Sequence, residues 1–206
     1  MKILKSIERS AKKIFLSFAK SLIKSEPIDL HEINHALIRR ILIVHLDRKV
    51  GNIVLSTAMI EKTKKTFLNS DVDILIASPV KIIVDDNPYL NNIYELNHSD
   101  YIKNPFKLFS LKRFLINQQY DLAIESSNPS GTSSFNGFIT YLTKAKYRVG
   151  FNGGNGALYT NIHIAPDNKD HYFISKQKLI SIFSKDKSIL LPKLFVNNPE
   201  QKKIRI

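Results

Sequence analysis

Hydrophobic and polar residues follow one another along this chain in a pattern that predicts strands and helices in turn. Short runs of branched apolar residues, typical of buried strands, are separated by segments whose apolar residues recur at helical spacing. The predicted strands cover residues 41–46, 72–77, 93–96, 122–125 and 148–151, and the predicted helices cover 53–68, 80–85, 105–119, 132–143 and 171–184. Such alternation builds a parallel sheet with right-handed crossovers, so the expected fold class is α/β, a Rossmann-like parallel sheet with flanking helices.

Residues 1–24 form a separate unit, whose apolar residues recur every three or four positions and whose polar face is basic. This pattern predicts a basic amphipathic helix preceding the sheet. Such a helix is typical of peripheral binding to an anionic membrane surface, but a helix packed on the body of the protein has the same pattern. The expected organisation is a helix and linker over 1–35, the Rossmann-like domain over 36–195, and a tail or the start of an interdomain linker over 196–206.

Composition narrows the classes of partner and site. The net charge of +13 at pH 7 indicates anionic partners, namely membrane headgroups, nucleic acid or a phosphorylated substrate. No recognition helix or aromatic RNA-binding motif is present, so nucleic acid is not expected. Cysteine is absent, which excludes disulfides and thiolate metal sites and fits a reducing cytoplasm. The scattered histidines, of which only His31 and His35 share helical spacing, predict no metal site.

The turn after the first predicted strand is the strongest candidate for a ligand site. Residues 41–46 run directly into the loop Asp47-Arg48-Lys49-Val50-Gly51-Asn52, and an apolar-periodic segment follows at once. In open α/β sheets ligands bind at the carboxyl ends of strands, and the first turn of a helix offers unpaired N–H groups to an anion. Gly51 allows a ligand to approach the backbone closely. Any α/β protein has several such turns, so position alone does not identify the site.

Five segments resemble glycosyltransferase family 9, the lipopolysaccharide heptosyltransferase family, in the family's own order. They are RKVGN followed by IVLSTA (48–58), VDILI (72–76), DNPYLNNIY (86–94), YDLAI (120–124) and AKYRVGF (145–151). The resemblance covers roughly residues 40 to 195. It implies one half of a GT-B fold, in which two Rossmann-like domains face each other, and this chain corresponds to the N-terminal, acceptor-binding half.

The resemblance also implies an activity, which is transfer of a sugar from a nucleotide donor to lipopolysaccharide or another surface glycan. No metal or cofactor is implied, because the nucleotide-sugar is a substrate. The implied partners are a glycolipid or glycan acceptor and a nucleotide-sugar held by a second domain. The implied location is cytoplasmic, on the inner face of the cell membrane. The chain ends at Ile206, about where the second domain is expected to begin. The alternative is therefore a non-catalytic, truncated or split family member that binds an acceptor or a membrane.

The resemblance assigns the candidate site residues one by one. Asn52 occupies the position of the family's Asp base, and because a neutral amide cannot accept a proton in this way, Asp47 is the nearest substitute carboxylate. Asp47 is equally typical of a residue that caps its own turn. Gly51, Glu125, Ser126 and Ser127 are the candidate acceptor-binding residues, although the serines also suit a connector that caps the next helix.

A basic strip is predicted on the segment that precedes the fourth strand. It consists of Lys103, Lys107, Lys112 and Arg113. These residues suit a phosphorylated lipid acceptor, and the simpler interpretation is a solvated helix face.

Overall fold

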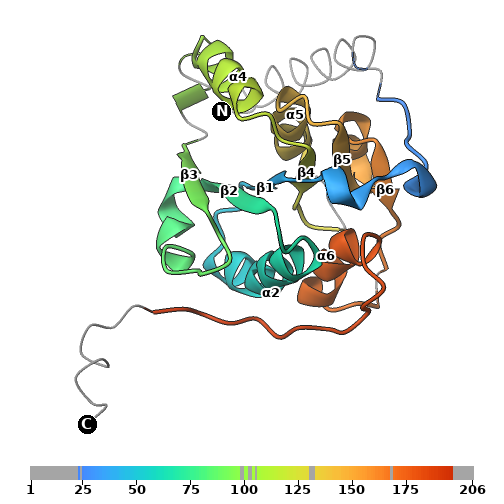
Figure 1. Ribbon diagram of the computed structural model, residues 1–206. Helices are drawn as coiled ribbons and strands as arrows, with labels where there is room; N and C mark the ends of the chain where they lie inside the picture. Colours follow the sequence, from blue (N-terminus) through green and yellow to red (C-terminus); the bar gives the residue numbers. More distant parts are fainter. Residues whose placement is uncertain are drawn as a thin grey trace.

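The computed structural model describes residue 23 and residues 25–97, 100–101, 104, 106–129, 133–167 and 169–196. Its centre is a sheet of six parallel strands in the order β3-β2-β1-β4-β5-β6 (Figure 1). The strands are β1 (Arg40–His45), β2 (Asp71–Ala77), β3 (Asn92–Leu96), β4 (Leu122–Glu125), β5 (Tyr147–Phe151) and β6 (Ile162–Ile164). The predicted α/β class and its parallel sheet are confirmed. The basic helix predicted over residues 1–24 lies almost wholly outside the described residues.

Helices cover both faces of the sheet. The helices α2 (Val50–Thr66) and α6 (Tyr172–Ser181) lie on one face, while α4 (Lys107–Asn117) and α5 (Ser134–Leu142) lie on the other (Figure 1). The described residues also include four short 3₁₀ helices, which are η1 (Leu30–Glu32), η2 (His35–Leu37), η3 (Ser78–Ile83) and η4 (Gly154–Tyr159). In the described part of the chain, no helix has the length and apolar content that crossing a bilayer requires.

Strand β1 shows why the sequence folds this way. Ile41 and Ile43 pack in the layer with α2 and α6, whereas Leu42 and Val44 pack in the layer with α4 and α5. Because both faces of a central parallel strand are buried, the sequence of such a strand is an unbroken run of apolar residues. That continuity made β1 recognisable from sequence.

The structure differs from the predicted elements in two places. Helix α2 begins at Val50, three residues earlier than predicted, so Gly51 and Asn52 lie in its first turn and not in the loop. The structure also has a 3₁₀ helix, η4, that begins at Gly154, in a segment where the sequence predicted neither a helix nor a strand. Tyr159 of η4 is fully buried and its ring lies 6.0 Å from that of Phe138, so tertiary packing outweighs the low helix propensity of the glycines.

The last described segment, up to Val196, runs along α2 in extended form. The backbone N–H of Lys193 donates to Thr57 Oγ1 at 3.0 Å, and Gln177 of α6 makes hydrogen bonds to both backbone groups of Leu190. These contacts attach the segment to the α2–α6 layer. The domain boundaries stated above stay predictions.

Candidate functional site

The strand order reverses between β1 and β4, and this switch point defines where a ligand is expected. The connection from β1 leads to β2 on one side, while β4 lies on the other side of β1 and continues to β5. A crevice forms at the carboxyl ends of strands where the order reverses. The loop after β1 carries Asp47 and Arg48, and the loop after β4 carries Ser126 and Ser127. The predicted catalytic and acceptor-binding residues therefore lie at or next to the carboxyl ends of β1 and β4, the two strands that flank the switch point.

Asp47 and Asn52, the two candidate catalytic residues, are in direct contact. Asn52 Nδ2 donates a hydrogen bond to Asp47 Oδ2, and the backbone N–H of Lys49 donates to Asp47 Oδ1 at 2.9 Å. Partial burial favours the neutral acid, but these hydrogen bonds outweigh it and hold the pKa of Asp47 below its ordinary value. Asp47 thus caps its own turn and is also an ionised carboxylate at neutral pH.

The start of α2 is open beside this pair. Its N-cap residue, Lys49, provides no side-chain hydrogen bond to the helix, and a Cβ placed on Gly51 would meet no atom within 4 Å. The packing of the described residues therefore does not require glycine at this position. The first turn of a helix carries N–H groups without intrahelical partners, so the open space next to Gly51 suits an anionic or hydroxyl-bearing ligand.

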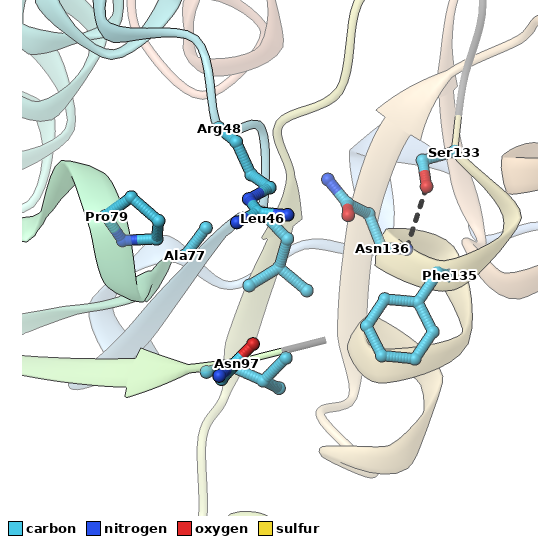
Figure 2. A pocket seen from close by; sticks show the side chains of 9 residues that line it. Leu46, Arg48, Ala77, Pro79, Asn97, Ser133, Phe135 and Asn136 are labelled. Carbon is cyan, nitrogen blue, oxygen red and sulfur yellow. Dashed lines mark hydrogen bonds between the residues drawn. The ribbon is translucent and has the colours of Figure 1, made fainter. Parts of the chain in front are cut away.

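A cavity of about 230 Å³ lies at the carboxyl ends of β1, β2 and β3 (Figure 2). Its lining residues are Leu46, Arg48, Ala77, Pro79, Leu96, Asn97, Ser133, Phe135 and Asn136. Figure 2 shows the guanidinium of Arg48 and the amide of Asn136 turned toward the same space from opposite sides. Pockets for drug-sized ligands measure about 300–1,000 Å³, so this cavity suits one polar unit of a larger ligand.

Behind the crevice, Lys176 of α6 holds the loop after β4. Its ammonium is completely buried and donates to the carbonyl oxygens of Ser126 and Ser127, the latter at 2.5 Å, and to Ser126 Oγ at 3.1 Å. Ser127 Oγ in turn donates to Oε1 of Glu125, while Oε2 of Glu125 has no hydrogen-bond partner among the described residues. Lys176 was not recognised as a site residue from the sequence. Its spacing from Leu179, Ile180 and Phe183, all buried, was the available signal, because it places a lysine within an apolar helical stripe.

Burial shifts the pKa values of Lys176 and Glu125 toward their neutral forms. Desolvation lowers the pKa of Lys176 to about 7, although the nearby Glu125 carboxyl opposes the shift. Desolvation likewise raises the pKa of Glu125, against the hydrogen bond from Ser127 and the charge of Lys176. Each group offsets part of the cost of burying the other, so they depend on one another for stability.

The three residues predicted to bind the acceptor from β4 and its loop are therefore buried. Glu125, Ser126 and Ser127 are at most 5% exposed, and their contacts are with protein groups. The alternative interpretation of the serines as a connector agrees with two observations. Ser133 Oγ accepts from the N–H of Asn136 at the start of α5, and Ser127 Oγ accepts from the N–H of Ser133 at 3.1 Å. Contact of these residues with an acceptor stays a prediction.

His45 ends β1 within the same buried region. Its Nδ1 lies 3.1 Å from Ser126 Oγ, and its Nε2 has no hydrogen-bond partner among the described residues. Burial, reinforced by the charge of Lys176, lowers the pKa of His45 to about 3, so the ring is neutral at physiological pH. In the described part of the chain, no group of three or more His, Asp or Glu residues is arranged to hold a metal ion.

Lys176→Met is expected to lower the free energy of unfolding by about 3–5 kcal/mol, because it leaves Glu125 buried without an opposite charge. The measurement is urea unfolding at pH 7. The matched control is Lys178→Met on the same helix, where the lysine is partly exposed and pairs with Asp167 and Asp170. This control is expected to cost less than about 1 kcal/mol. Equal losses in the two variants would contradict a special role for Lys176.

Among known proteins, similarity to this chain was found with solved structures and not with family profiles or curated sequences. The glycosyltransferase family 9 structure from Veillonella parvula DSM 2008 is similar with a TM-score of 0.64 at 13% identity, over 80% of this chain and 47% of that chain. E. coli ADP-heptose lps heptosyltransferase II has a TM-score of 0.58 at 15% identity, over 79% and 48%.

E. coli heptosyltransferase WaaC with ADP is similar with a TM-score of 0.57 at 13% identity, over 69% of this chain and 46% of that chain. This chain thus spans about half the length of the solved structures that it matches. The resemblance found in the sequence is confirmed at the level of the fold. The chain has the fold of about half of a glycosyltransferase family 9 protein, with its strand-order switch point between β1 and β4.

Proposed function

We propose that this chain forms the acceptor-binding half of a glycosyltransferase, which moves a heptose or related sugar from a nucleotide donor to lipopolysaccharide or another surface glycan. The observation that carries the proposal is the Asp47–Asn52 pair at the switch point. A shared fold with heptosyltransferases supports it, and one of the matched structures contains ADP-2-deoxy-2-fluoro heptose. The nucleotide-sugar binds in a second domain, as the resemblance implies.

Asp47 is the general base in this proposal. As the acceptor hydroxyl attacks the anomeric carbon of the donor sugar, its O–H bond breaks and the proton passes to Asp47. The new glycosidic bond forms as the bond to the nucleotide diphosphate breaks, and the leaving group departs with the bonding electrons. Asn52 orients the carboxylate through Nδ2, and its Oδ1 can accept a hydrogen bond from a neighbouring sugar hydroxyl.

Arg48 recognises a phosphate or another anionic group on the acceptor. A guanidinium forms strong, paired hydrogen bonds with phosphate oxygens, and the open start of α2 favours negative charge nearby. Asn136, on the other side of the cavity, suits a hydroxyl group. Residues 1–24 are proposed to add a contact with the anionic inner face of the cell membrane.

A second function is an acceptor-binding module without catalysis. Asn52 favours it, because the resembled family has a carboxylate at this position. Acceptor binding without any sugar transfer, when a donor-binding domain is supplied, would support this module over the enzyme.

The proposal is tested by titrating the isotope-labelled chain with a soluble, phosphorylated lipopolysaccharide core oligosaccharide. Arg48, Asn97 and Asn136 are expected to show the largest chemical-shift changes. Arg48→Gln should weaken binding by roughly tenfold, which corresponds to about 1.4 kcal/mol. The control is Arg39→Gln, because Arg39 precedes β1 and so lies at the opposite edge of the sheet. Binding that is unaffected by Arg48→Gln would contradict the proposed site.

A further inference from the structure

The outer face of α4 exposes two aromatic rings next to each other. Phe106 and Phe109 are 77% and 71% exposed, and their rings stack with centroids 6.5 Å apart. The core-facing side of the same helix buries Leu111 and Leu115. The helix thus carries apolar residues on both sides, although one side is enough to attach it to the sheet.

Basic residues flank the exposed rings. At 100° per residue, Lys112, Arg113 and Ile116 fall on the same side of the helix as the two phenylalanines, and all three are exposed. Lys107 pairs with Asp100 at 3.3 Å. No acidic residue occurs between Phe106 and Asn117. We call Phe106, Phe109, Lys112, Arg113 and Ile116 the α4 outer face.

The chain connectivity places the start of α4 at the carboxyl edge of the sheet, which is the edge that carries the proposed acceptor site. Helix α4 follows the carboxyl end of β3, where Leu96 and Asn97 line the cavity. The phenylalanines lie at the start of α4, which is the end nearer to the carboxyl edge of the sheet. Figure 1 shows α4 beside α5 on the same face of the sheet, toward the edge strand β3.

We propose that the α4 outer face docks on an anionic lipid surface and holds the carboxyl edge of the sheet against it. The inference that a lipid-linked acceptor is thereby presented to the cavity rests on the proposed function. Aromatic rings flanked by lysine and arginine are the pattern of helices that lie in the membrane interface. A protein partner of neutral or basic surface would leave the cations unpaired, whereas anionic headgroups satisfy them.

A site-specific probe tests this contact independently of residues 1–24. The chain has no cysteine, so Ser110→Cys gives a single labelling position on α4 for a polarity-sensitive fluorophore. Leu68→Cys is the matched control, because Leu68 is 72% exposed and follows α2, at the opposite edge of the sheet. On vesicles of phosphatidylcholine and phosphatidylglycerol, the probe at 110 should shift to shorter wavelength and be quenched by brominated lipid. The probe at 68 should do neither.

Two variants separate the apolar and ionic contributions. In the Ser110→Cys background, Phe106→Ser with Phe109→Ser should abolish quenching by brominated lipid. Lys112→Gln with Arg113→Gln should weaken binding to anionic vesicles by about tenfold or more, since each basic residue near such a surface contributes about 1 kcal/mol. Vesicles of pure phosphatidylcholine should bind more weakly and show little dependence on this pair.

Three results would overturn the proposal. They are an unchanged probe at 110 on anionic vesicles, equal responses of the probes at 110 and 68, and a wavelength shift that depends on protein concentration without lipid. The last result would assign the face to a second copy of this chain. The vesicles contain no glycan, so a failure here leaves oligosaccharide binding at Arg48 unaffected, and the two proposals can fail separately.

Discussion

Asp47→Asn is expected to lower the rate of sugar transfer by a factor of about 10²–10⁴, the usual contribution of a positioned general base. The amide keeps the size and shape of the side chain but cannot take up the proton of the acceptor hydroxyl. Transfer is followed with radiolabelled ADP-heptose and a lipopolysaccharide acceptor, with a donor-binding Rossmann domain supplied in trans. The loss should appear in kcat, while KM for the acceptor changes little, because the cavity around Arg48 is preserved.

Asn52→Asp is the comparison variant for the same assay. It places a second carboxylate against Asp47, and two carboxylates in contact share a proton, which raises the pKa of the pair. A base of higher pKa should increase the rate of sugar transfer and shift the pH dependence of that rate toward higher pH. If Asp47→Asn retained the full rate while Asn52→Asp increased it, the base would belong to position 52 and the role given to Asp47 would be wrong.

Acidification is expected to destabilise the protein through His45. The unfolded chain binds a proton on this histidine below pH 6.5, whereas the folded protein does so only near pH 3, because the ring is buried beside Lys176. The unfolded state therefore binds more protons throughout this window, and stability falls as the pH falls. The interval of 3.5 units between 6.5 and 3 corresponds to about 5 kcal/mol at 1.36 kcal/mol per unit.

The measurement is urea unfolding at several pH values between 7 and 3. His45→Gln should be less sensitive to acid than the wild-type protein, because glutamine does not titrate. His31→Gln is the control, since His31 is exposed and should leave the pH dependence unchanged. Parallel curves for the wild-type protein and His45→Gln would show that other groups account for acid unfolding.

The sheet was predictable because its central strands are buried on both faces. Ile41 to Val44 and Leu122 to Ile124 all lie in the core, so each strand reads as an apolar run ended by a polar loop. Strand β6 was missed because Ile162–Ile164 is only three residues long, with a histidine at its centre. A segment of this length carries too little pattern to separate a strand from a loop.

The site was less predictable, because its contacts join residues whose spacing carries no signal. Asp47 and Asn52 were named from sequence, but their contact depends on α2 beginning at Val50. Lys176 lies 50 residues from Ser126, and only the packing of α6 under the end of β4 brings them together. The burial of Glu125 could not be read from sequence either, since an acid at the end of a strand is equally typical of an exposed loop.

The attachment of Lys176 has a consequence for how the crevice adapts to ligands of different shape. Moving the loop after β4 would break the hydrogen bonds from Lys176 to the carbonyl oxygens of Ser126 and Ser127. The Lys176 ammonium would then be buried without these hydrogen-bond partners. The side of the crevice that is formed by the loop after β4 is therefore rigid. The loop after β1 and the first turn of α2 have exposed residues at 48–51, and Arg48 has a long, rotatable side chain. Under the proposed function, adjustment to different sugars is expected on the Arg48 side of the crevice, so substitutions that alter acceptor preference should accumulate around Arg48 and seldom near Lys176.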